Sequence, residues 1–105
     1  MTVEHNNRSS EKWLERALAD AVAERGGVAV KLTSPGLSGL PDRLVLWPGG
    51  RAEFVELKST GRTLRPLQRL VRDTLERMEF RCTVIDNEEK LKQWLHSNRD
   101  LTRTW

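Results

Sequence analysis

A strand-turn-strand segment between residues 39 and 58 constrains the fold more than any other part of this chain. Two apolar runs, 44–47 and 52–58, flank the turn sequence Pro48-Gly49-Gly50-Arg51. Apolar and β-branched runs on either side of a proline-glycine turn predict a β-hairpin. A hairpin brings the start of its first strand beside the end of its second, so the residues at that open end lie close together.

Charged residues occupy that open end. Asp42 precedes the first strand, and Glu56 and Lys58 end the second. Alternate side chains of a strand share a face, so Glu56 and Lys58 point the same way, beside Asp42. Two carboxylates in this arrangement can bind a hard cation such as Mg²⁺, with the lysine free to face a reacting water. The alternative is an ordinary cross-strand ion pair, because Glu-x-Lys also occurs by chance in strands.

The combination of Pro41-Asp42 with Glu56-x-Lys58 across a hairpin resembles the PD-(D/E)xK nuclease superfamily. Within it, the chain looks like the virus-type replication-repair nuclease (VRR-Nuc) family. The resemblance covers about residues 11–86 and rests on Lys31, the segments 39–43 and 54–58, Gly61, Leu64 and Gln68.

This resemblance implies a metal-dependent nuclease site. Asp42 and Glu56 are expected to hold Mg²⁺ or Mn²⁺, joined by the Leu57 backbone carbonyl and by a glutamate of the first helix. Glu11 is the first choice for that glutamate and Glu15 the alternate, although both are also ordinary helix residues. The metal would act as a Lewis acid and lower the pKa of bound water.

Two further polar residues match the family pattern near the site. Lys58 would position or deprotonate the attacking water and offset developing charge. Gln68, one turn into the second helix, could orient the site through its amide, although glutamine is usually only a surface residue.

Basic residues predict contacts with the phosphates of DNA. The chain has a formal net charge of +3. The candidates lie at the end of the first strand, in the loop after it, and around the start of the second helix: Lys31, Ser34, Arg62, Arg65, Arg69 and Arg72. The alternative is a solvated helix face, because acidic residues interleave further along that helix.

The remaining patterns predict an α/β fold. Three- and four-residue spacing of apolar residues predicts a helix over 10–25, and a strand follows over 28–32. After the hairpin, a helix over 64–79 capped by Thr63, a strand over 81–86 and a helix from about Asn87 to Leu95 complete the order αβββαβα. This order gives an α/β domain with a mixed sheet of about four strands flanked by helices, and the resemblance implies that it is a PD-(D/E)xK restriction-endonuclease-like core. The strand after the crossover should pair in parallel.

The length and composition of the chain limit the number of domains and the expected location of the protein. The 105 residues suit one nuclease domain over 1–105, with its core at about 9–97 and polar termini. No apolar run approaches the roughly 20 residues that span a bilayer, and the N-terminus lacks a signal-peptide core. We expect no membrane partner and a cytoplasmic location in a bacterial or phage-infected cell.

The sequence gives little support for thiol, zinc or serine-nucleophile chemistry. Cys82 lies in a predicted strand as an inert buried thiol, and His5 and His96 are too far apart for a zinc site. Ser34 and Ser38 have no histidine partner, which disfavours a serine nucleophile. Arg43 points away from Asp42 by strand alternation, so it is expected to support the fold or a dimer and not to touch metal.

Small stand-alone members of the resembled family look like dimeric, structure-selective enzymes. This likeness implies a homodimeric endonuclease that cuts branched DNA, with Holliday-junction resolution as the specific expectation. A flap or nicking nuclease with the same catalytic residues is one alternative, and a non-catalytic DNA-binding module is another.

Overall fold

The computed structural model describes residues 10–33, 39–59 and 61–98. Its elements follow one another as α2 (Glu11–Glu24), β1 (Val28–Lys31), β2 (Arg43–Trp47), β3 (Arg51–Leu57), α3 (Pro66–Arg77), β4 (Cys82–Ile85) and α4 (Glu88–Ser97). This order confirms the αβββαβα expectation.

The four strands form one mixed sheet in the order β1-β2-β3-β4. β1 with β2 and β2 with β3 are antiparallel, whereas β3 and β4 are parallel. The hairpin turns at Gly49 and Gly50, whose φ angles of 90° and 86° are accessible at little cost only to glycine. The crossover through α3 makes the parallel pairing possible, as predicted.

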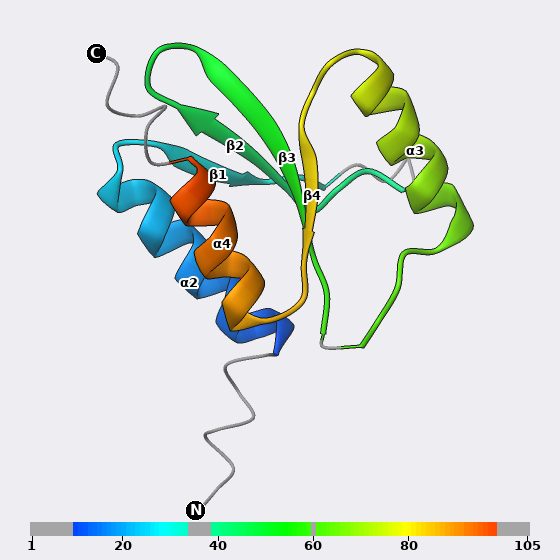
Figure 1. The fold of residues 1–105 in the computed structure, drawn as a ribbon, viewed down its shortest axis with the longest axis horizontal. Helices are drawn as coiled ribbons and strands as arrows, with labels where there is room; N and C mark the ends of the chain where they lie inside the picture. Colours follow the sequence, from blue (N-terminus) through cyan, green and yellow to red (C-terminus); the bar gives the residue numbers. More distant parts are fainter. Residues whose placement is uncertain (1–9, 34–38, 60, 99–105) are drawn as a thin grey trace, which may run out of the picture.

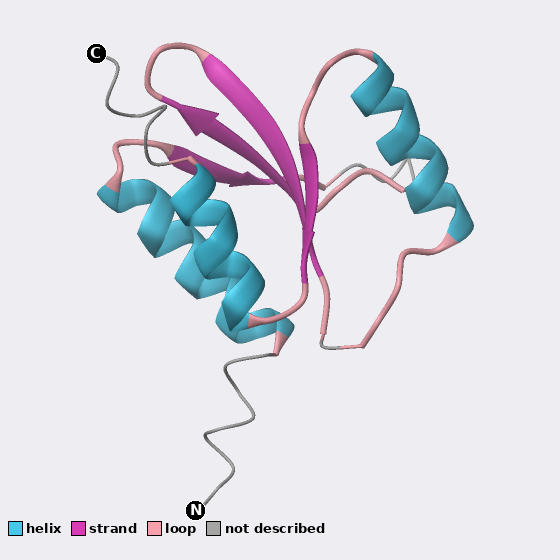
Figure 2. Cartoon of the chain, viewed as in Figure 1, coloured by secondary structure: helices cyan, strands magenta, loops and turns pink. Residues whose placement is uncertain are grey.

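Helices cover the two faces of this sheet unequally (Figures 1 and 2). α2 and α4 lie side by side against one face, and α3 lies alone on the other. The main core fills the space between the sheet and the α2–α4 pair; its buried residues are Leu14, Leu18, Val22, Val45, Trp47, Val55, Leu57, Ile85, Leu91 and Trp94. Glu56 alternates with the core residues Val55 and Leu57, so its side chain lies on the α3 face.

Two helix starts follow ordinary capping and one does not. Ser10 Oγ accepts from Trp13 N at 3.1 Å, and Asn87 Oδ1 accepts from Lys90 N at 2.9 Å. The Thr63 cap predicted for α3 is wrong, because the N-cap is Arg65. There Gln68 Oε1 accepts from Arg65 N at 2.8 Å, so a glutamine side chain reaching back from the third helical position defines the start.

None of the helices in the described part of the chain has the length and apolar character needed to cross a membrane.

Candidate active site

Asp42 and Glu56 are linked reciprocally at the open end of the hairpin. The backbone N–H of Asp42 donates to Glu56 Oε1 at 3.1 Å, and the backbone N–H of Leu57 donates to Asp42 Oδ2 at 2.9 Å. Each carboxylate is therefore held by the strand that carries the other. The proximity predicted from the hairpin is confirmed, and a backbone N–H donates to each of the two carboxylates.

Glu56 is the centre of the polar cluster. Lys58 Nζ lies 3.4 Å from Glu56 Oε2, and Gln68 Nε2 donates to the same oxygen at 3.1 Å. Glu56 is 7% exposed and Gln68 is 8% exposed, so this hydrogen bond is shielded from water. Because Gln68 also accepts from the Arg65 backbone, its amide orientation is fixed and α3 begins at the site.

Burial raises the pKa of Glu56 above its usual value, and the neighbouring Asp42 carboxylate raises it further. Lys58 acts in the opposite direction and lowers the pKa, but it does not outweigh burial. The site thus holds negative charge that the protein compensates incompletely. A bound cation would relieve both the burial cost and the repulsion between the carboxylates, and oxygen donors suit Mg²⁺ or Mn²⁺.

The third protein carboxylate expected for such a metal is not brought into the cluster. Across residues 10–33, 39–59 and 61–98, no group of three or more Asp, Glu, His or Cys side chains is arranged to hold a metal ion. Glu11 is exposed at the first position of α2. Glu15 instead pairs with Arg43, with Glu15 Oε1 lying 3.2 Å from Arg43 Nη2. Asp42 and Glu56 are the two carboxylates that the structure brings together, and the Leu57 carbonyl stays a prediction.

The loop before Asp42 packs closely on α3. Gly39 has φ of 92°, and a Cβ at this position would lie 3.0 Å from both the Leu67 side chain and the Leu67 carbonyl oxygen. Glycine thus allows the loop to approach the helix that carries Gln68. A small pocket beside Glu56 is lined by Gly39, Pro41 and Gln68, among others.

Most of the basic residues predicted to contact DNA are exposed, at the end of β1 and near the start of α3. Lys31 is exposed at the end of β1, and the next residue, Leu32, donates its N–H to the Asp42 carbonyl at 2.8 Å. Arg62, Arg65 and Arg69 are exposed near the start of α3. Arg72 is half-buried, with its Nε 3.6 Å from Glu76 Oε2, and it lines the pocket beside Glu56. Ser34 lies outside the described residues.

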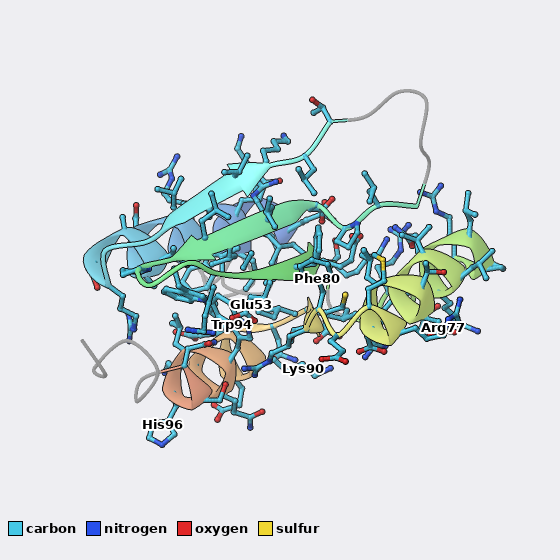
Figure 3. All side chains as sticks on the ribbon, turned by 90° about the horizontal axis from the view of Figure 1, so that it is seen from above. Glu53, Arg77, Phe80, Lys90, Trp94 and His96 are labelled. Atoms are coloured by element: carbon cyan, nitrogen blue, oxygen red, sulfur yellow. The ribbon has the colours of Figure 1, made fainter. Side chains whose placement is uncertain are left out.

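A buried carboxylate on the opposite face of the sheet was missed by sequence reasoning. Glu53 is 1% exposed and accepts from Trp47 Nε1 at 2.7 Å and from Trp94 Nε1 at 2.9 Å. Figure 3 shows Glu53 beside Trp94, between the sheet and α4. The alternation of side chains along the strand could have predicted that Glu53 is buried, because it shares its face with Val55 and Leu57. Glu53 belongs to the core and not to the site.

Among the residues excluded from chemistry, Cys82, His96 and Arg43 lie as expected, whereas His5, Ser34 and Ser38 lie outside the described residues. Cys82 is buried, and burial raises the pKa of its thiol to about 11, so the thiol is inert at neutral pH. His96 points away from α4 into solvent (Figure 3). Arg43 is buried on the face opposite to Glu56, where it supports the fold through Glu15.

Comparisons with known proteins identify proteins that are similar to this chain. A scan against protein-family models found no match. A curated protein named "Putative nuclease p44", from Acyrthosiphon pisum secondary endosymbiont phage 1, is 37% identical over 79 residues, which cover 75% of this chain and 85% of that protein. A solved structure described as a VRR_NUC domain superposes with a TM-score of 0.78 at 24% identity, covering 82% of this chain and 94% of the other.

The similarity to the solved structure shows the fold of the chain. The phage protein is also related to the chain in sequence. The chain has the fold of a VRR_NUC domain and belongs to the same family as the phage protein named putative nuclease p44.

Proposed function

We propose that this protein is a Mg²⁺- or Mn²⁺-dependent endonuclease that hydrolyses phosphodiester bonds in branched DNA. The observation that carries the proposal is the buried Glu56, which lies within contact distance of Lys58 and Gln68 and is hydrogen-bonded to the backbone of Asp42. A structural ion pair alone would not need a second carboxylate and a buried amide around the same glutamate.

Asp42 and Glu56 would hold the metal, with the Leu57 carbonyl as a third oxygen donor. Mg²⁺ commonly keeps several waters, so few protein ligands are sufficient. When bound, the metal would supply Lewis-acid chemistry and make water a stronger nucleophile. A helix glutamate as a further ligand stays a prediction, with Glu11 as the first candidate and Glu15 as the alternate.

The chain's own residues would orient the reactants. Lys58, whose side chain is 16% exposed, can direct its ammonium at the attacking water and offset charge on the phosphate. Gln68 holds Glu56 in one orientation because its amide is fixed at both ends. Asp42 is held through its backbone and its carboxylate, so the site needs little rearrangement before reaction.

DNA is the proposed substrate because phosphates suit the exposed basic residues around the carboxylates. Arg65 and Arg69 lie on the helix start that Gln68 ties to Glu56, and Arg62 lies in the segment before it. A symmetric homodimer would present two such sites related by a two-fold axis, which suits cleavage of both strands at a four-way junction. Holliday-junction resolution is therefore the specific proposal.

The test is cleavage of a labelled four-way junction beside flap, nicked and linear duplexes, with Mg²⁺ or Mn²⁺ and with EDTA. We expect paired junction cuts that EDTA and Lys58→Ala abolish while junction binding is retained. Lys92→Ala is the matched control, since Lys92 is exposed on α4 with its ammonium 3.8 Å from Glu88.

The outcomes separate the alternatives. Cleavage confined to flaps or nicked DNA would keep the nuclease and discard resolution. Binding without cleavage by any form would favour a DNA-binding module. Sedimentation of the wild-type protein should show a dimer, and a strict monomer at working concentration would contradict paired junction cleavage.

A further inference from the structure

Arg43 connects α2 to the backbone of a proposed metal ligand. It begins β2 directly after Asp42 and is 6% exposed. One end of its guanidinium, Nη2, lies 3.2 Å from Glu15 Oε1 on α2. The other, Nη1, donates to the Asp42 carbonyl oxygen at 3.3 Å. A single buried side chain therefore bridges a helix on one face of the sheet and the residue whose backbone N–H donates to Glu56.

The Asp42 carbonyl oxygen accepts hydrogen bonds from two different parts of the fold. Besides Arg43, it accepts from the backbone N–H of Leu32 at 2.8 Å. On its other side Asp42 is tied to β3, through its N–H to Glu56 and its carboxylate to the Leu57 N–H. A shift of the peptide group that follows Asp42 would therefore be transmitted to the carboxylate.

We propose that Arg43 and Glu15 act as a positioning pair that fixes Asp42 in the geometry needed for metal binding and cleavage. Glu15 thereby serves as the anchor of Arg43 and not as a metal ligand. The inference rests on the proposed nuclease function and assigns a role to two residues outside the carboxylate cluster.

The chemistry of the pair supports this role. A buried guanidinium needs acceptors for its N–H groups, and its planar shape lets separate nitrogens reach two oxygens at once. Removal of Glu15 leaves Arg43 buried with its charge uncompensated, and removal of Arg43 leaves Glu15 half-buried without its partner. A lysine carries the charge but has only one nitrogen, so Arg43→Lys should restore the contact with Glu15 and weaken the contact with the carbonyl.

The first experiment measures junction cleavage by Arg43→Met, Arg43→Lys, Glu15→Gln and the Arg43→Met/Glu15→Gln double variant. Loss of groups that orient metal ligands typically costs about 10–100-fold in metal affinity or activity. We expect a fall of that size in kcat with KM changed little, partial recovery in Arg43→Lys, and a double variant no worse than the singles. Glu24→Gln makes the same change at an exposed α2 residue and should match wild type.

The second experiment reads the geometry of Asp42 without metal or substrate. Amide hydrogen exchange is compared at Leu57, whose N–H donates to the Asp42 carboxylate, and at Phe54, whose N–H donates to the Arg81 carbonyl at 2.8 Å on the same strand. We expect Arg43→Met and Glu15→Gln to accelerate exchange at Leu57 relative to Phe54. General destabilisation of the fold would accelerate both amides together.

Each outcome decides the inference. A Leu57-to-Phe54 exchange ratio at the wild-type value in both variants would overturn it. So would a much larger rise in the metal concentration for half-maximal activity in Glu15→Gln than in Arg43→Met, because that result makes Glu15 a ligand. If the wild-type protein does not cut DNA, the proposed function fails, and the exchange ratio still decides whether the pair positions Asp42.

Discussion

At the scale of single residues, the place of Glu56 in the proposed site comes with a cost to stability. Its pKa is raised in the folded protein, first by burial and then by Asp42, above the value of 4.5 for an unperturbed glutamate. The folded state therefore binds this proton more tightly than the unfolded state does. The stabilisation from the protonated form is fully present below about pH 4.5 and is lost as the pH rises through the folded pKa.

The raised pKa of Glu56 predicts how Glu56→Gln changes the stability of the protein. The amide removes the buried negative charge, so the variant should unfold at a higher temperature than wild type at pH 7 and lose cleavage. The gain should shrink as the pH falls toward 4.5, because wild-type Glu56 is then protonated. Thermal unfolding of both proteins between pH 4 and pH 8 checks this. An equal difference at every pH would show that the charge of Glu56 is not the cause.

Cys82 gives a second prediction at this scale. Burial raises the pKa of its thiol to about 11, and the buried position blocks reagents. Alkylation by iodoacetamide at pH 8 should therefore be slow in the folded protein and become fast in denaturant, since the thiolate is the nucleophile. Mass spectrometry of the labelled protein over time measures both rates. Rapid labelling of the folded protein would contradict the burial of β4 beneath α3.

At the scale of secondary-structure elements, the start of α3 carries one residue that contacts the candidate site and others that are exposed to solvent. Gln68 faces inward to Glu56, whereas Arg65 and Arg69 are exposed on the same turns. Arg69→Ala should weaken DNA binding for all sequences and lower the slope of log K against log salt by about 1, as expected for one lost phosphate contact. Fluorescence anisotropy at several salt concentrations measures both quantities.

Arg77→Ala is the matched control for Arg69. Arg77 is exposed at the far end of the same helix, where it donates to Thr74 Oγ1 at 3.2 Å and points into solvent (Figure 3). Removal of this charge should leave the salt slope near its wild-type value. Equal effects of both substitutions would indicate attraction by net charge and not a contact beside the site.

Local patterns predicted most elements because each depends on neighbouring residues. Turn glycines define the hairpin, and alternation along β3 places Glu56 and Lys58 on one face, which the structure confirms. The start of α3 was placed wrongly at Thr63, although local signals mark Arg65: Pro66 occupies the first helical position, and Gln68 accepts from the Arg65 N–H. The partner of Glu15 could not be predicted from local patterns, since Arg43 lies on another element.

At the scale of the whole molecule, Glu53 holds the hairpin and α4 together. Its carboxylate accepts from the indoles of Trp47 and Trp94, and the Arg81 guanidinium lies 3.7 Å away. The two rings also pack against each other, with centroids 5.7 Å apart. Since Trp47 ends β2 and Trp94 lies on α4, this one side chain links two layers that are far apart in the sequence.

Replacement of Glu53 by leucine should therefore destabilise the entire fold. The leucine fills the volume but leaves two indole N–H groups buried without acceptors, which should cost about 3 kcal/mol of unfolding free energy. Urea unfolding followed by tryptophan fluorescence measures this loss. Glu89→Gln, at an exposed position of α4, controls for removal of a glutamate charge. Because Glu53 and Glu56 lie on opposite faces of β3, Glu53→Leu should retain cleavage at temperatures where it is folded. Loss of activity without loss of stability would instead place Glu53 in the chemistry of the site.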